Sequence, residues 1–157
     1  MSRREIAEKA FTDGYNCSQS IVIAFADLLP ADTDTVLKLV SPYGGGMGRL
    51  REVCGAFTGA LAVLGLLRGY SMPETGDKKA RLYERVQALA ASFKAEHRSV
   101  VCRDMLRLPP GPDTPKPEPR TEEYYRKRPC LKVIGDMAEL LENELERDDQ
   151  PRNQADQ

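Results

Sequence analysis

The sequence predicts an all-α protein, a compact single-domain bundle of about five to seven helices. Apolar residues recur every three or four positions over most of the chain, which is the spacing of one helix face. Polar capping residues, glycines and prolines divide these stretches into helices of ordinary length, and no alternating apolar run reaches the length of a strand. The chain has 157 residues, which suits one domain with a modest core.

Two helices are expected before residue 30. The apolar residues of the first begin at Ile6, and Asp13-Gly14 ends it. Asn16 is a favourable N-cap for a second helix over about Cys17 to Leu29, which Pro30 stops. This second helix is apolar over most of its circumference, which is typical of an interior helix.

The next stretch predicts a third helix, a loop and a fourth helix. Asp32 opens the short third helix. Four of its residues are expected to face inward: Val36, Leu37, Leu39 and Val40. The glycine-rich segment 42–49 (PYGGGMGR) predicts a loop, and an apolar helix follows it over about 52–69. Small residues early in this helix would let another helix approach closely.

Three further helices are expected in the second half. A long amphipathic helix covers about 77–98, a short one about 99–108, and the last one about 130–147. The inward face of the last helix is expected to be Ile134, Met137, Ala138, Leu141 and Leu145. Between the last two helices, residues 109–120 contain six of the eleven prolines, which predicts an extended connection.

These elements predict one helical domain over residues 1–147, with the proline-rich connection inside it. The polar residues 148–157 predict a disordered tail. The small-residue fourth helix and the interior-looking second helix would fit a homodimer, and they would fit a compact monomer equally well.

Charge and composition argue against several classes of protein. Lys and Arg number 23 against 24 Asp and Glu, so the net charge is −1, whereas nucleic-acid-binding domains usually carry a strongly basic face. The most apolar stretch, 53–67, is shorter than the roughly 20 residues that a transmembrane helix needs. The N-terminal residues lack the apolar core of a signal peptide. We therefore expect a cytoplasmic protein with no nucleic-acid partner and no membrane span.

The four cysteines share a position relative to the predicted helices. Each lies at or near a helix N-terminus: Cys17, Cys54, Cys102 and Cys130. The free N–H groups and the positive dipole end of a helix favour a thiolate and lower the pKa of the thiol. The arginines that would add to this effect are Arg49, Arg51, Arg103 and Arg128. The simpler alternative is four buried side chains, since free cysteine is among the most buried residue types.

Cysteine spacing leaves the kind of site open. No two cysteines form a Cys-x-x-Cys pair, so the sequence has neither a thioredoxin-like motif nor the paired spacing of a zinc ribbon. Any joint site must be assembled from four different helices. Spacing alone therefore does not separate a dithiol pair from a four-thiolate site that holds zinc or an iron–sulfur cluster.

Two other features have both a functional and a structural interpretation. The glycines of segment 44–49 could present N–H groups to an anion, but the Lys-Ser/Thr of a phosphate-binding loop is missing. A permissive link that lets the backbone pass close to Cys54 is favoured. His97, the only histidine, could accept a proton from a thiol, but its place near a helix C-terminus favours a capping role.

Three stretches of the sequence resemble the redox-active family named for its C-GCAxxG-C-C pattern. They are Asn16-Cys17-Ser18-Gln19-Ser20, Gly44-Gly45-Gly46-Met47-Gly48-Arg49 and Cys54-Gly55-Ala56-Phe57-Thr58-Gly59. The resemblance covers about residues 5–146, and the later cysteines complete it, although Val53 precedes Cys54 where the family name has glycine. It implies a small bacterial or archaeal thiol protein, often encoded near transporter genes. It also implies that the four cysteines are the redox residues, without indicating which two are partners.

The leading hypothesis is a thiol–disulfide redox protein without a cofactor. Cys54 would attack an oxidised partner, and Cys17 would resolve the mixed disulfide. The partner is expected to be a redox protein or a small molecule of the thiol/disulfide type. Cys102 and Cys130 would form a second pair or relay. One alternative is a protein that binds zinc or an iron–sulfur cluster through the same four thiolates. The other is a helical interaction module without catalysis.

Overall fold

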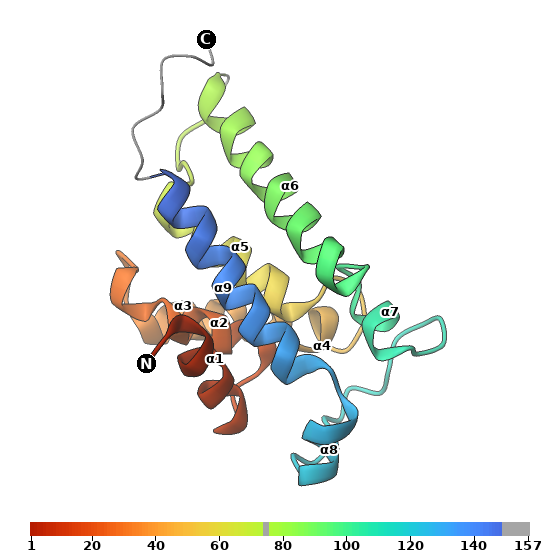
Figure 1. The fold of residues 1–157 in the computed structure, drawn as a ribbon. Helices are drawn as coiled ribbons and strands as arrows, with labels where there is room; N and C mark the ends of the chain where they lie inside the picture. The colour runs from red at the N-terminus through yellow and green to blue at the C-terminus, as the bar shows by residue number, and fades with distance from the viewer. Residues whose placement is uncertain (74–75, 149–157) are drawn as a thin grey trace.

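The computed structural model describes residues 1–73 and 76–148 and confirms the all-α fold (Figure 1). The described residues form nine α-helical segments, two short 3-10 turns and no β-strand. Their one β-type pairing is an isolated antiparallel bridge between Val53 and Val101. Within these described ranges, no helix combines the length and the apolar character that crossing a membrane requires.

The helices follow the order that the sequence predicts. In the first half they are α1 (Arg3–Thr12), α2 (Cys17–Ala24), α3 (Thr33–Val40), α4 (Gly44–Met47) and α5 (Gly55–Arg68). In the second half they are α6 (Asp77–His97), α7 (Cys102–Leu106), α8 (Glu122–Lys127) and α9 (Cys130–Asp148). The 3-10 turns are Ala26–Leu28 and Ser41–Tyr43.

The predicted caps set the starts of the early helices. The Asn16 side chain accepts a hydrogen bond from the Gln19 N–H at the start of α2, and Gln19 bonds back to the Asn16 N–H. Asp32 caps α3 by accepting from the Thr35 N–H at 2.8 Å. These two caps satisfy N–H groups that would otherwise lack a partner at a helix end.

The core lies where α2, α5 and α9 pack together. Helix α1 covers α2 and α9 on one side, and α6 packs against α5 and α9 on the other, so that α9 lies between α1 and α6 in Figure 1. The predicted face of α9 is buried in full. The largest fully buried side chains include Phe11, Ile21, Phe25, Leu64, Phe93 and Met137.

Three details differ from the sequence prediction. Helix α2 ends at Ala24 rather than Leu29, because the backbone of the fully buried Phe25 leaves the helical region and a 3-10 turn follows. In α3 only Val36 and Val40, one turn apart, are buried; Leu39 lies beside that face and is 61% exposed. The glycine segment contains the single distorted turn α4, and α8 was not expected, so there are more helical segments than the predicted five to seven.

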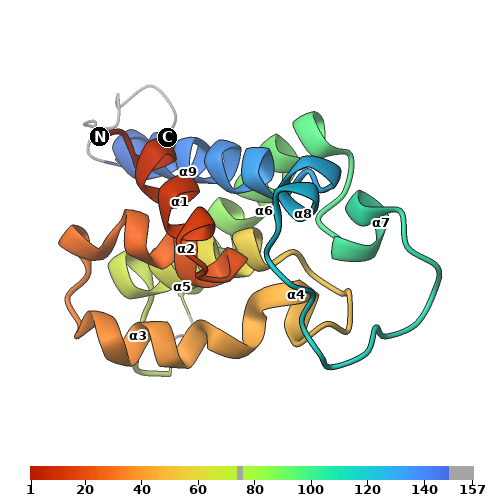
Figure 2. The same ribbon diagram turned by 90° about the horizontal axis from the view of Figure 1, so that it is seen from below.

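The proline-rich connection is extended, as predicted. No helix is present from residue 109 to 120, which we call the strap. Figure 2 shows the chain after α7 running outward and past α4 before it returns to α8. The predicted disordered tail begins at the end of α9, and residues 149–157 lie outside the described part of the chain.

Candidate functional site

The four cysteines begin four helices, as the sequence predicts. Cys17, Cys102 and Cys130 are the first residues of α2, α7 and α9, and Cys54 is the N-cap residue of α5. All four are free, and all four line one cavity of about 270 Å³, the cysteine cavity. The fold therefore brings together residues that are widely separated in sequence.

The bridge between Val53 and Val101 brings Cys54 and Cys102 together. The Cys54 N–H donates to the Val100 carbonyl at 2.8 Å, and the Cys102 N–H donates to the Glu52 carbonyl at 2.6 Å. In an antiparallel pair, residues next to the bridged pair point to the face opposite that pair. Cys54 and Cys102 consequently share one face, and this face lines the cysteine cavity.

The thiols of Cys17 and Cys130 interact at the starts of α2 and α9. A side-chain hydrogen bond between them raises the pKa of Cys17 and lowers the pKa of Cys130. Burial raises the pKa of Cys17 further. Burial opposes the shift at Cys130, but the guanidinium groups of Arg128, Arg51 and Arg120 reinforce it. Cys130 is thus the thiol whose ionised form the site stabilises.

The other two thiols are held in the neutral form. Burial raises the pKa of Cys54 to about 12, although the N–H groups of Phe57 and Ala56 at the start of α5 act in the opposite direction. Burial also raises the pKa of Cys102. There the opposing group is Arg51, whose Nη1 donates to the Cys102 sulfur at 3.7 Å. Desolvation outweighs the helix N-terminus at Cys54 and outweighs Arg51 at Cys102.

Glycines allow the close approach of the four segments. Gly46 has a φ of +67°, and a Cβ atom there would lie 2.6 Å from the Cβ of Cys102. A Cβ at Gly55 would lie 3.0 Å from the Cβ of Cys17. The expected permissive role of the glycine segment is therefore supported: Gly46 passes against Cys102, and Gly44 passes against Gly55, the residue that follows Cys54.

The segment before Cys54 has an unusual backbone. All five residues 45–49 have positive φ, and so does Arg51, at 60°. Conformations of this kind are costly for residues other than glycine and are concentrated at functional sites. Here they place the Arg51 side chain, which is only 4% exposed, between Cys102 and Asp113, where its Nη2 lies 3.0 Å from the carboxylate.

The strap forms one wall of the cysteine cavity through Pro115, Pro117, Glu118 and Arg120. Arg120 donates to the carbonyls of Phe11 and Tyr15 at 3.1 and 3.2 Å, and its guanidinium lies 4.3 Å from the centre of the Phe11 ring. Glu118 pairs with Arg128 at 2.6 Å. The prolines predicted an extended segment, but no sequence pattern indicated that it covers the thiols.

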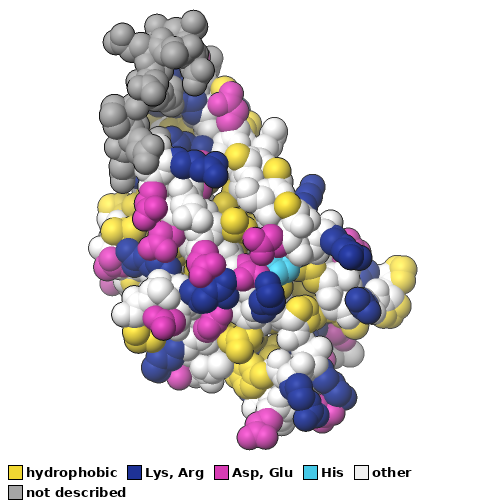
Figure 3. Space-filling view, viewed as in Figure 1, with side chains coloured by type: hydrophobic (Ala, Val, Ile, Leu, Met, Phe, Trp, Pro, Cys, Tyr) yellow, Lys and Arg dark blue, Asp and Glu magenta, His cyan; other side chains and the backbone are white. Residues whose placement is uncertain are grey.

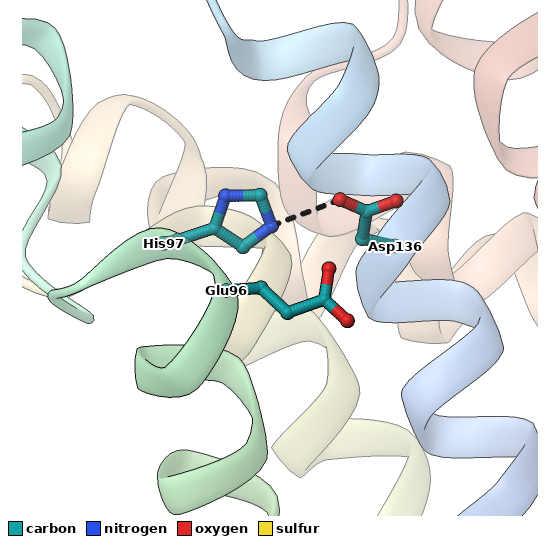
Figure 4. A group of neighbouring side chains, drawn as sticks. All are labelled: Glu96, His97 and Asp136. Carbon is teal, nitrogen blue, oxygen red and sulfur yellow. Dashed lines mark ion pairs between the residues drawn. The ribbon is translucent and has the colours of Figure 1, made fainter.

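A separate polar cluster joins α6 to α9. Figure 4 shows His97 and Glu96 at the end of α6 facing Asp136 of α9. His97 Nε2 lies 3.1 Å from Asp136 Oδ2, and Asp136 also accepts hydrogen bonds from Arg4 and Lys132. In the described residues, the one group of three or more His, Cys, Asp or Glu ligand atoms within 4.8 Å of one another is Glu96, His97 and Asp136. Because two cations already engage Asp136, we interpret the cluster as a structural clamp.

The roles expected of the cysteines stay predictions, because all four are free in the structure. The sequence analysis paired Cys54 with Cys17, whereas the thiol that acts most strongly on the pKa of Cys17 is that of Cys130. It also expected Cys54 to have the low pKa, and burial raises that pKa instead. Of the four arginines expected nearby, Arg51 and Arg128 act on the thiols; Arg120 does so too and was not anticipated.

Comparison with known proteins gives one match. Residues 15–144 match the family model described as "Putative redox-active protein (C_GCAxxG_C_C)". The matched range contains all four cysteines and covers most of the chain. Neither the curated proteins nor the solved structures provide a match.

Proposed function

This chain belongs to the C_GCAxxG_C_C family, and we propose that it is a cytoplasmic thiol–disulfide redox protein. In this proposal Cys130 is the attacking thiol and Cys17 resolves the mixed disulfide. Cys54 and Cys102 form a second pair beside them. The cytoplasm suits this chemistry because it keeps free thiols reduced.

The placement of Cys17 and Cys130 in one cavity, where their thiols interact, is the observation that carries the proposal. A thiolate, rather than a thiol, attacks a disulfide, and the pKa of Cys130 is lowered by this interaction and by arginine charge. The resolving thiol must be close to the attacking one, and Cys17 is already in contact with it. Both residues line the cysteine cavity, where an oxidised substrate can reach them.

The proposed reaction is a two-step exchange. The Cys130 thiolate attacks one sulfur of a substrate disulfide, so that a mixed disulfide forms and one substrate thiolate leaves. The Cys17 thiol then gives up its proton to that thiolate and attacks the Cys130 sulfur. The products are a Cys17–Cys130 disulfide and two reduced substrate halves, one as a thiol and one as a thiolate. Two electrons pass from the protein to the substrate.

Cys54 and Cys102 would regenerate the reduced pair. Thiol–disulfide exchange moves the disulfide from Cys17 and Cys130 to these two cysteines, with no net loss of electrons. Their raised pKa values make them poor primary nucleophiles, which suits thiols that react only after the first pair is oxidised. Their shared face toward the same cavity supports this role.

Mapping the first disulfide tests the proposal. Fully reduced protein would be treated with less than one equivalent of a small disulfide, alkylated and mapped by peptide mass spectrometry. We expect the first bridge to be Cys17–Cys130. Cys17→Ser should accumulate the substrate half on Cys130, whereas Cys54→Ser should still form the first bridge. A first bridge between Cys54 and Cys17 would overturn the assignment.

The convergence of four thiols on one cavity favours a second candidate, a zinc or iron–sulfur site. The donor set suits either group, but no three of the four cysteine sulfur atoms in the described residues lie within 4.8 Å of one another. Metal binding would therefore require the segments to close in. Intact mass of anaerobically purified protein would identify this case, since an excess mass under native conditions would vanish on denaturation.

A further inference from the structure

A second hollow adjoins the cysteine cavity. This outer groove, of about 810 Å³, is lined by α7, α8 and the end of the strap. Six residues line both hollows: Met105, Leu106, Glu118, Tyr124, Arg128 and Pro129. A single layer of side chains therefore separates the outer groove from the thiols.

The ion pair between Arg128 and Glu118 belongs to this shared wall. The two groups lie 2.6 Å apart, and the Arg128 guanidinium lies 4.6 Å from the centre of the Tyr124 ring. Glu118 is about half exposed, whereas Arg128 is largely buried. Arg128 also lowers the pKa of Cys130. A molecule that moved inward from the groove would thus meet Arg128 and then the attacking thiol.

The two hollows are strongly basic in a chain whose net charge is −1. Their basic side chains are Arg49, Arg51, Arg107, Arg120, Arg126, Lys127 and Arg128, and their acidic ones are Glu118 and Glu123. Asp113, just outside the lining, pairs with Arg49 and Arg51 and leaves a clear excess of positive charge. Figure 3 shows Lys and Arg side chains over α8, with Asp or Glu side chains beside them. A concave surface of one charge sign attracts ligands of the opposite sign.

The cysteine cavity has the size and lining of a site for a small organic molecule. Its apolar wall includes Met105, Leu106, Pro115, Pro117 and Val133. Small-molecule sites combine such apolar walls with a few fixed polar groups. Cys54 and Cys102 are only 6% and 8% exposed, so the second pair is open to small molecules rather than to the surface of another protein.

We infer that the substrate is a small organic disulfide that carries carboxylates, and that it enters through the outer groove. This inference rests on the proposed function and names the substrate class for it. A substrate carboxylate replaces Glu118 on Arg128, which places the substrate disulfide beside the Cys130 sulfur. The exchange described above then oxidises Cys17 and Cys130 and releases both substrate halves, one as a thiol and one as a thiolate.

Three small disulfides that differ in charge test the inference. They are dithiodiglycolate, a dianion; hydroxyethyl disulfide, which is neutral; and cystamine, a dication. The rate of Cys17–Cys130 bridge formation would be measured by quenched mass spectrometry. It would be divided by the rate at which the same disulfide reacts with mercaptoethanol, which corrects for the intrinsic reactivity of each disulfide. We expect the normalised rate for the dianion to exceed that for the dication by about tenfold or more at low salt, and the difference to shrink as salt is added.

Variants locate the recognition. Arg128→Gln should lower the dianion-to-neutral rate ratio several-fold, Arg128→Lys should retain most of it, and Glu118→Gln should raise it. The ratio separates recognition from reactivity, because a change in the pKa of Cys130 alters the rate with every disulfide. Arg81→Gln, on the exposed side of α6 and outside both hollows, is the matched control. If Arg128→Gln fails to fold, Arg126→Gln, which lines only the outer groove, provides the same comparison.

The outcomes separate the two proposals. The substrate class is wrong, and the redox function stands, if all three disulfides oxidise Cys17 and Cys130 at equal normalised rates. The same holds if the substitutions at Arg128 or Arg126 and at Glu118 leave the dianion-to-neutral rate ratio unchanged. If none of the three disulfides forms the Cys17–Cys130 bridge, the proposed function itself is wrong.

Discussion

The thiols of Cys17 and Cys130 interact, and both line the cysteine cavity. This interaction joins the first residue of α2 to the first residue of α9. It raises the pKa of Cys17 and lowers the pKa of Cys130. The proposed attacking group and the proposed resolving group are therefore neighbours before any substrate arrives.

The first prediction concerns the hydrogen bond itself. Cys17→Ala removes the donor, so the pKa of Cys130 should rise and alkylation of Cys130 at neutral pH should slow by about tenfold for each pKa unit regained. Cys17→Ser keeps a donor in the same place and should stay close to the wild type. The measurement is the iodoacetamide rate at Cys130 as a function of pH. Equal profiles for the alanine and serine variants would refute the role of the donor.

The second prediction concerns stability at alkaline pH. The pKa of Cys54 is raised from 9.0 to about 12 in the folded protein, so the unfolded chain loses this proton first as pH rises. The stabilisation is complete below pH 9 and is lost between pH 9 and about 12, at about 1 kcal/mol per pH unit. Urea denaturation of reduced protein should show this slope, and Cys54→Ala should show a shallower one. Parallel slopes for the two proteins would contradict the prediction.

Sequence reasoning located the cysteines at helix starts, but it did not indicate which thiols lie next to each other. The helix starts follow from local signals such as the Asn16 cap, which act within one turn. Which thiols meet depends on how α2, α5, α7 and α9 pack, and no spacing in the sequence encodes that. The low pKa was misplaced for a related reason. Cys54 is indeed at a helix N-terminus, but its burial, which is a property of the whole fold, dominates its pKa.

The third prediction concerns residues 45–49, the segment of positive φ before Cys54. Gly46→Ala places a side chain at a φ of +67° and a Cβ atom 2.6 Å from that of Cys102, so it should destabilise the fold by about 2 kcal/mol or more. Gly65→Ala is the matched control, because a Cβ at that exposed position in α5 meets no atom within 4 Å. It should stabilise the protein by up to about 1 kcal/mol. Thermal or urea denaturation measures both, and a loss of the same size in both variants would contradict the argument.

The fourth prediction concerns the clamp on Asp136. Burial alone would raise its pKa, but the hydrogen bonds from Arg4 and Lys132 outweigh burial and lower it. Asp136→Asn should therefore cost about 1–3 kcal/mol at neutral pH. Because the folded pKa is depressed, this difference is present above the usual carboxyl pKa of about 3.9 and should vanish as pH falls through the lower folded value.

Glu139 provides the comparison for that measurement. It also bonds Arg4 but is 52% exposed, so Glu139→Gln should cost less than about 1 kcal/mol. Chemical denaturation at neutral and acidic pH would measure both variants. A cost for Asp136→Asn that does not change with pH would show that its negative charge is not what holds the clamp.

The packing of α9 against α1 and α2 also sets an order of events during synthesis. A chain is made and folds from its N-terminus onward, so Cys17, Cys54 and Cys102 leave the ribosome before Cys130 does. Until α9 docks, Cys17 lacks the neighbouring sulfur of Cys130. The pKa of Cys130 is therefore lowered only once α9 has packed against α2. In the proposed reaction, the bridge between these two residues cannot precede that docking step.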